Sequence, residues 1–279
     1  MTTNTKITFI GAGNMASSII AGLVESDSAV EITVSDPNES QLDVVRAQFP
    51  NCHTTTDNHQ AVSTADVIVL AVKPQVMQVV CEGLEPSVQK TKPMIISVAA
   101  GVSESSLSRW LGGELPVVRC MPNTPALVGA GMSGLYANSR VSAEQKNLAE
   151  SMLRAVGVVM WLDNEDMLHA VTAVSGSGPA YFFLVMEAMQ QSAESFGFTP
   201  EQARLLVQQT AFGAAKLAME SVDSAAVLRA KVTSKGGTTE AAINDLQASG
   251  LEGIFDSALK AAANRSIVLS GGQPAIEKS

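Results

Sequence analysis

Aromatic side chains are scarce in this sequence, at 4% of its 279 residues, and charged residues make up 16%. Hydrophobic residues account for 46%, which excludes an intrinsically disordered chain. With so few aromatic rings, we expect alanine, valine and methionine to fill a core of closely packed helices. The chain is longer than a usual single domain, so two unequal domains are predicted.

Basic residues are outnumbered by acidic ones, 18 to 27, which gives a formal net charge of -9. This charge repels phosphate backbones, and no cluster of Lys and Arg offsets it. We therefore expect no nucleic-acid partner and a small-molecule substrate.

Cysteine is also rare, and Cys52, Cys81 and Cys120 are widely spaced without a CxxC pair. An odd number at such spacing excludes a disulfide framework and a zinc site. We expect three reduced, mostly buried thiols. The three histidines lie far from each other and from any nucleophile–acid pattern, so surface or capping roles and no metal site are predicted.

Targeting and membrane segments are not apparent. The N-terminus lacks a basic region followed by a long apolar core, and no later run provides the ~20 apolar residues of a membrane span. The expected location is therefore the cytoplasm, without a membrane partner.

The N-terminal segment follows a strand, turn, helix pattern. Lys6–Ile10 is rich in strand-forming residues and runs into GAGNMA, before an apolar-periodic helix over Met15–Val24. Gly11 permits the tight turn, Gly13 lets a pyrophosphate approach the backbone, and Ala16 allows close helix–strand packing. This arrangement predicts a dinucleotide site.

A second strand, Glu31–Val34, ends near the residues expected to recognise the coenzyme ribose. Asp36 lies where an acid binds the 2′-hydroxyl of NAD, which would disfavour NADP. Asp36 also precedes Pro37, so it could open a turn, and Ser35 or Asn38 could instead bind a 2′-phosphate. The choice between NADPH and NADH stays open.

Further strands alternate with helices, which is the rhythm of a doubly wound parallel sheet covered on both faces. Expected strands are Val67–Ala71, Met94–Ser97, Val117–Cys120 and Val158–Leu162. Expected helices cover Ser40–Phe49, Gln75–Leu84, Glu104–Leu111 and, after a Ser142–Gln145 capping box, the residues up to Ala155. Ligands bind beyond the carboxyl ends of such strands, at the loops Lys73–Pro74, Ala99–Gly101 and Met121–Pro125.

Strand signals cease near Met167, and helical periodicity continues to the end. The predicted division is a Rossmann-type α/β domain over residues 1–165 and an all-α domain over residues 166–279. Within the latter, Val232–Gln247 reads VTSKGGTTEAAINDLQ, a glycine pair leading into a helix beside Thr238 and Thr239. This helix start is an anion seat for a carboxylate or phosphate, or an ordinary threonine N-cap.

Six motifs together resemble the pyrroline-5-carboxylate reductase family: GAGNMA, AVKP, AAG, MPNTP, VSGSGPAY and TSKGGTT. The resemblance covers nearly the whole chain. It implies NAD(P)H-dependent reduction of L-1-pyrroline-5-carboxylate to L-proline in proline biosynthesis, commonly with NADPH. It also implies that the C-terminal helical domain mediates homodimerisation, with a decamer as a larger assembly.

The resemblance also implies a set of site residues. Coenzyme contacts would be Gly11, Ala12, Gly13, Asn14, Met15, Ser35, Asp36, Asn58, Ala71, Val72, Lys73, Pro74, Ala99, Ala100, Gly101 and Asn123. Substrate contacts would be Ser175, Gly176, Ser177, Ser234, Gly236, Gly237, Thr238 and Thr239, with Thr239 and Glu165 as catalytic residues.

Three positions depart from the family pattern. Lys235 stands where proline is usual, Ser224–Ala225 replaces a common His-Pro, and Lys231 replaces an asparagine. None removes a reacting group, so activity is expected. Lys235 near a carboxylate could alter affinity or pH dependence.

In the expected mechanism, Thr239 hydrogen-bonds the ring nitrogen, and either Thr239 or an ordered water supplies the proton, unless the substrate binds already protonated. A β-hydroxyacid dehydrogenase is the rival enzyme, but it would need a lysine a few residues into the helix that here reads AYFFLVMEAM. A non-catalytic dinucleotide-sensing regulator is the second rival, and it would not require the anion seat of Val232–Gln247.

Overall fold

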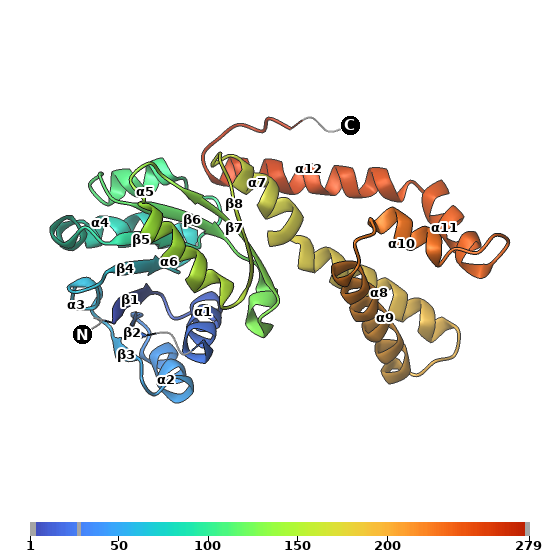
Figure 1. The fold of residues 1–279 in the computed structure, drawn as a ribbon, viewed down its shortest axis with the longest axis horizontal. Helices are drawn as coiled ribbons and strands as arrows, with labels where there is room; N and C mark the ends of the chain where they lie inside the picture. Colours follow the sequence, from blue (N-terminus) through green and yellow to red (C-terminus); the bar gives the residue numbers. More distant parts are fainter. Residues whose placement is uncertain (1–3, 27–28, 277–279) are drawn as a thin grey trace. The chain divides into compact units, whose positions relative to one another are not determined.

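The computed structural model describes residues 4–26 and 29–276. They form two compact units: a first unit of residues 4–177 and 261–276, and a second unit of residues 178–260. Figure 1 shows a sheet flanked by helices in the first unit and helices in the second. The two units are described separately.

The first unit is built on an eight-stranded sheet in the order β3-β2-β1-β4-β5-β6-β7-β8. Neighbouring strands are parallel except β6 and β7, which are antiparallel. The strands are β1 Thr5–Ile10, β2 Val30–Ser35, β3 His53–Thr55, β4 Val67–Leu70, β5 Met94–Ser97, β6 Val117–Met121, β7 Gly131–Ala137 and β8 Gly157–Trp161. The predicted Rossmann-type fold is confirmed.

Helices cover both faces of this sheet, as the apolar strands predicted. One buried cluster joins the sheet to α1, α2 and α6, and a second joins it to α3, α4 and α5. The bounds are α1 Asn14–Glu25, α2 Glu39–Gln48, α3 Asn58–Val62, α4 Pro74–Thr91, α5 Glu104–Trp110 and α6 Ala143–Arg154. Because each face has its own core, the edge that carries the strand ends is held rigidly.

Two strands were not predicted, β3 and β7. β3 has three residues, too few for an alternation signal. β7 contains Gly131 and Gly134, which weaken a strand pattern, yet both glycines are needed because an added Cβ would overlap Val156 and Val171 respectively.

After β8, the chain continues as one helical run of three parts. These are α7 Met167–Val171, the π-helix η2 Thr172–Gly176, and α8 Gly178–Ser195 of the second unit. The run Met167–Ser195 is long and apolar enough to cross a membrane by length and composition alone, which the sequence interpretation had excluded. The Ser-Gly-Ser-Gly-Pro interruption concealed this continuity in the sequence.

The second unit contains α8, α9 Pro200–Glu220, α10 Ala225–Lys231, α11 Thr238–Ala248 and the start of α12 Leu251–Leu269. α9 begins with a capping box of Thr199 and Gln202, and α8 packs against it. α12 begins at Leu251, and its last residues belong to the first unit. Among the described residues of α10 and α11, none is buried.

Candidate active site

The turn between β1 and α1 has the geometry of a dinucleotide loop, Gly11–Gly13. Gly11 has a φ of 103°, and a Cβ there would lie 2.7 Å from the Ala71 carbonyl oxygen. Its N–H donates to the Ser35 carbonyl at 2.7 Å, so β2 and β4 both fix the turn. Only glycine fits this position, as the sequence predicted.

The helix that follows this loop starts without a side-chain cap. Gly13 is the N-cap residue of α1 in an extended conformation, and no side chain in the described structure caps it. Nothing lies within 4 Å of a Cβ added at Gly13, so the space beside its backbone is open. The first-turn N–H groups, including those of Asn14 and Met15, with the positive helix end, suit a pyrophosphate.

Asp36 lies directly beside the Gly11–Gly13 loop. One carboxylate oxygen accepts from the Ala12 N–H at 2.9 Å, and the other accepts from the Asn38 N–H at 2.9 Å. Its side chain therefore closes the turn after β2, as one of the two alternatives predicted, and also contacts the loop.

The two other candidate ribose contacts are occupied locally. The Ser35 hydroxyl is buried and donates to Asn58 Oδ1 at 2.7 Å. Asn38 caps α2, and its Oδ1 accepts from the Ser40 N–H at 3.1 Å. The Ser35–Asn58 bond joins two predicted coenzyme residues that are separated by 23 positions in the chain.

The remaining predicted coenzyme loops lie at the same edge of the sheet. Ala71–Pro74 follows β4, with Lys73 as the N-cap residue of α4, and Ala99–Gly101 follows β5. Because β1, β4 and β5 are adjacent and parallel, their carboxyl ends share one edge. Gly101, with a φ of 73°, lies against Leu269 of α12.

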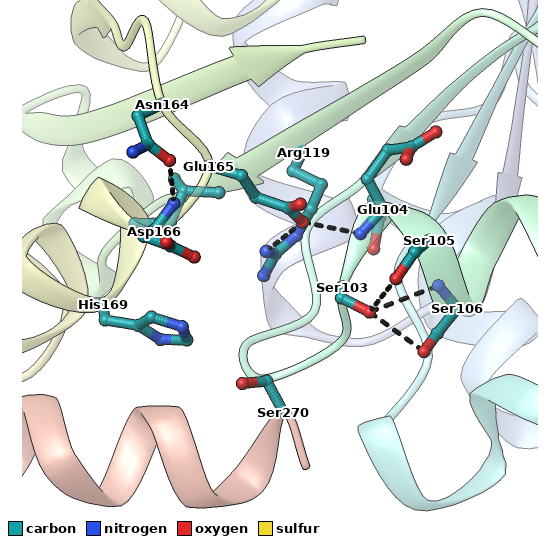
Figure 2. A network of polar contacts seen from close by, with 12 residues as sticks. Ser103, Glu104, Ser105, Ser106, Arg119, Asn164, Glu165, Asp166, His169 and Ser270 are labelled. Atoms are coloured by element: carbon teal, nitrogen blue, oxygen red, sulfur yellow. Dashed lines mark hydrogen bonds and ion pairs between the residues drawn. The ribbon is translucent and has the colours of Figure 1, made fainter. Parts of the chain in front are cut away.

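Glu165 is held in a polar network beyond β6 (Figure 2). Its Oε1 accepts from Arg119 Nη1 at 2.6 Å and from the Glu104 N–H at 2.6 Å. The Arg119 side chain is 7% exposed and that of Glu165 25%, so the ion pair is largely withdrawn from water. Removing either partner would leave a buried charge, which costs about 3–5 kcal/mol.

The pKa values of two neighbouring groups, Tyr136 and His169, are shifted by burial and by the charges of this network. Burial raises the pKa of Tyr136, and the Glu165 and Glu104 carboxylates add to that rise. Burial also lowers the pKa of His169, and the nearby Arg119 charge lowers it further. His169 Nδ1 lies 2.9 Å from the Ser266 hydroxyl on α12, so it links two elements of the first unit instead of taking the surface or capping role predicted.

Ser175 and Gly176 lie in the π-helix η2, and Ser177 follows it. The Ser177 N–H donates to the Thr172 carbonyl at 2.8 Å, an i to i+5 bond. Asn123, predicted to contact the coenzyme, donates from Nδ2 to the Ser175 carbonyl at 3.1 Å.

The glycine–threonine stretch of the second unit starts α11, as predicted, but its cap differs from prediction. The N-cap residue is Gly237, and no side chain caps this helix in the described structure, so Thr238 does not serve as an N-cap. The Gly236 N–H donates to Glu240 Oε2 at 2.6 Å, and the Gly237 N–H donates to the Ser234 carbonyl at 3.0 Å. The N–H groups of Thr238 and Thr239 lie in the first turn of this helix, the position predicted for the anion seat.

Two of the departures from the family pattern have local structural explanations. Lys231 forms an ion pair with Asp223. Ser224 caps α10, accepting from the Val227 N–H at 3.4 Å. Lys235 is exposed, and nothing in the structure explains its presence.

The cysteines are free, as predicted: Cys81 and Cys120 are buried and Cys52 is half-buried. Burial raises the pKa of Cys81 and that of Cys120 to about 12, so neither thiol suits nucleophilic chemistry. The described residues contain no group of three or more His, Cys, Asp or Glu able to hold a metal ion.

Sequence reasoning missed Arg119 and the backbone N–H of Glu104 as the partners of Glu165. Arg119 stands alone in the apolar strand VVRCM, which was a usable signal because an arginine is almost never buried without a partner. The identity of that partner had no signal, since Glu165 lies 46 residues further along the chain.

Two known protein families match separate parts of this chain. Residues 165–269 match the family described as pyrroline-5-carboxylate reductase dimerisation. Residues 6–101 match the family described as NADP oxidoreductase coenzyme F420-dependent. The second match covers the Gly11–Gly13 loop, Asp36 and the loops after β4 and β5.

Similar proteins extend over the whole chain. The pyrroline-5-carboxylate reductase of Pseudomonas aeruginosa is 51% identical, over 95% of this chain and 97% of its own. The structure of a pyrroline-5-carboxylate reductase from Coxiella burnetii is 48% identical with a TM-score of 0.90, covering 96% of this chain and 99% of its own. A Plasmodium falciparum pyrroline carboxylate reductase with NADP bound is 25% identical, with a TM-score of 0.85 and coverage of 96% and 99%. This chain therefore belongs to the pyrroline-5-carboxylate reductase family.

Proposed function

We propose that this chain reduces L-1-pyrroline-5-carboxylate to L-proline with NAD(P)H. The main support is that each unit contains a helix whose N-cap residue is a glycine, without a side-chain cap. These helices are α1 after Gly13 and α11 after Gly237. Such helix starts attract anions, and the coenzyme pyrophosphate and the substrate carboxylate are both anions.

In the first unit, the Gly11–Gly13 loop and the first turn of α1 would hold the pyrophosphate. Asp36 would hydrogen-bond the adenosine ribose, and the loops after β4 and β5 would line the crevice at the edge of the sheet. When bound, the coenzyme supplies the hydride that reduces the imine carbon. The protein's task is then to hold and orient the substrate and to assist protonation of its nitrogen.

In the second unit, the N–H groups of Thr238 and Thr239 would bind the substrate carboxylate. The Thr239 hydroxyl would hydrogen-bond the ring nitrogen, which becomes more basic as the imine is reduced to the amine. The proton comes from this hydroxyl or from a water that it orders. Ser234, Gly236 and Gly237 would shape the turn that presents both threonines.

Glu165 is the second proposed catalytic residue. Its two described hydrogen bonds both use Oε1, and Oε2 accepts none of the hydrogen bonds described. Arg119 and the N–H at the start of α5 would hold the carboxylate in a fixed orientation beside the substrate and the nicotinamide.

Oligomerisation would complete the second unit. Large apolar side chains on α8 and α9 are exposed in the single chain, among them Phe182 at 69%, Leu184 at 65% and Phe212 at 63%. Patches of this kind mark interfaces, and this segment matches the dimerisation family. We propose a cytoplasmic homodimer formed through these helices, with a decamer as the larger assembly, and no membrane or nucleic-acid partner.

A two-substrate assay tests the reaction. Oxidation of NAD(P)H with pyrroline-5-carboxylate is expected, whereas a 3-hydroxy acid should give no reduction of NAD(P)+. Turnover of the 3-hydroxy acid would support a β-hydroxyacid dehydrogenase instead. Coenzyme binding without either activity would support a dinucleotide-sensing regulator.

Thr239→Ala tests the role of the α11 threonine. Loss of a positioned donor typically lowers turnover about 100-fold or more, and we expect this for kcat with pyrroline-5-carboxylate. Thr210→Ala on α9 is the matched control, since that hydroxyl bonds only its own helix at Leu206 among the described contacts. A loss within about threefold, under 1 kcal/mol of barrier, would exclude the role of Thr239.

A further inference from the structure

The helical run from α7 to α8 contains a proline at a position that disturbs its hydrogen bonds. Pro179 lies four residues after Ser175, so it lacks the N–H that would bond the Ser175 carbonyl in a regular α-helix. The proline ring would also crowd that carbonyl. The π-helix η2 ends at Gly176, three residues before Pro179, and widens the turn that contains Ser175.

Asn123 supplies a donor to the carbonyl that Pro179 leaves without its usual partner. Its Nδ2 donates to the Ser175 carbonyl at 3.1 Å, while its Oδ1 accepts from the Met132 N–H at 2.8 Å. The first bond reaches η2 across 52 positions of the chain, and the second anchors the amide at the start of β7. Both ends of the carboxamide are therefore fixed within the first unit.

The local conformation at Asn123 supports a dedicated role. Asn123 is the N-cap residue of the short 3-10 helix η1, Thr124–Val128, where an asparagine side chain ordinarily caps the helix. In the described structure it makes no cap bond. Its side chain hydrogen-bonds the backbone of Ser175 and Met132 instead of capping its own helix.

A second contact joins the same two segments. Gly176 of η2 lies so close to Met121 that an added Cβ would overlap the Met121 methyl group. Met121 ends β6, two residues before Asn123. The end of β6 and the loop that contains Asn123 therefore contact η2 through one hydrogen bond and through close packing.

We propose that Asn123 is a positioning residue that replaces the backbone donor missing at Pro179 and thereby orients Ser175, Gly176 and Ser177 for the substrate. This inference rests on the proposed function, since the family resemblance implies that those three residues contact the substrate of that reaction. It reassigns Asn123 from coenzyme contact to substrate positioning. Loss of a coenzyme ligand would change the dissociation constant for NADPH. Loss of a substrate-positioning residue would instead change the KM for pyrroline-5-carboxylate.

The experiment compares Asn123→Ala and Asn123→Asp with the control Asn51→Ala, an exposed asparagine in the turn before β3. Asn123→Asp keeps an acceptor for Met132 but places a carboxylate against the Ser175 carbonyl. Hydrogen exchange of the peptide containing the Ser177 N–H reports the π-turn, whether or not the protein reduces pyrroline-5-carboxylate. Coenzyme fluorescence gives the NADPH dissociation constant separately.

We expect faster exchange at Ser177 in both Asn123 variants, with the NADPH dissociation constant within about twofold of wild type. The KM for pyrroline-5-carboxylate should rise about tenfold or more, as for loss of one oriented contact. Unchanged exchange, or a fall in NADPH affinity that matches the loss of activity, would overturn the proposal. If the wild-type protein does not reduce pyrroline-5-carboxylate, the proposed function fails while the exchange result still tests Asn123.

Pro179→Ala provides a direct test of the replacement itself. The new N–H at position 179 can bond the Ser175 carbonyl, so the Asn123 donor becomes redundant. The fold-change in exchange caused by Asn123→Ala should therefore be smaller in the Pro179→Ala background, a non-additivity that a double-mutant cycle measures. Equal fold-changes in the two backgrounds would contradict the proposed replacement.

Discussion

The two units differ sharply in how they bury apolar side chains. The first unit holds two buried clusters, one on each face of its sheet. In the second unit, α8 buries Gly178, α9 buries Ala203 and Val207, and the described residues of α10 and α11 bury none. The first unit can therefore be stable on its own core, whereas the second needs a further surface to cover its apolar side chains.

The same difference applies to the two segments that are proposed to bind the coenzyme and the substrate. The Gly11–Gly13 loop, proposed to bind the coenzyme, follows a strand with packed side chains, and the Gly11 N–H is bonded to Ser35. The turn before α11 lies among exposed residues, and its geometry depends on Glu240, which holds the Gly236 N–H. We expect coenzyme affinity to be insensitive to assembly and substrate turnover to depend on it.

The largest effect is expected from a charge in the apolar surface of the second unit. Phe182→Glu should weaken self-association at least about 100-fold, because an unpaired charge buried at an interface costs several kcal/mol. Sedimentation across protein concentrations measures this, together with the loss of turnover. Val44→Glu on α2, equally an exposed apolar residue in the single chain, is the control. Unaltered assembly of Phe182→Glu would show that α8 lies outside the interface.

A smaller effect is expected at Asp36 in the first unit. Asp36→Ser removes the carboxylate held by Ala12 and Asn38, so the affinity for NADPH should rise relative to NADH by about tenfold, or about 1.4 kcal/mol. Dissociation constants for both coenzymes measure the ratio. Asp43→Asn is the matched charge control, since Asp43 pairs with Arg46 on exposed α2. A change in the ratio below twofold would mean that Asp36 does not face the ribose.

The smallest effect is expected at His169, which contacts Ser266 of α12 within the first unit. Burial lowers its pKa below 6.5, so below that pH the unfolded chain takes up a proton that the folded chain does not. The free energy of unfolding should therefore fall as the pH decreases through and below 6.5. His169→Gln should make that fall shallower in urea titrations at pH 7.5 and 5.5, whereas His59→Gln should not. Parallel pH profiles for wild type and His169→Gln would contradict this account.

Much of the first unit was predictable because its signals are local. The strand before GAGNMA, the turn glycines and the βα alternation each depend on residues close in sequence, and the fold they predicted is confirmed. β3 was too short and β7 too rich in glycine for the same signals. Thr238 illustrates a local rule that failed, because Gly237 caps α11 and leaves the threonine side chain uncommitted as a cap.

The polar network around Glu165 was not predictable because it depends on distant pairs. Arg119 and Glu165 are 46 positions apart, and Asn123 and Ser175 are 52 apart. No periodicity or capping rule links such residues. Glu165 and Asn58 became candidates through family resemblance alone, and their proposed roles in catalysis and coenzyme binding stay predictions.

The most direct measurement follows the hydride itself. The protein would be incubated with L-1-pyrroline-5-carboxylate and a reduced coenzyme carrying deuterium at both C4 positions, and the product would be analysed by mass spectrometry and NMR. The account predicts L-proline with one deuterium at C5, the former imine carbon. Absence of proline, or proline without deuterium, would contradict it.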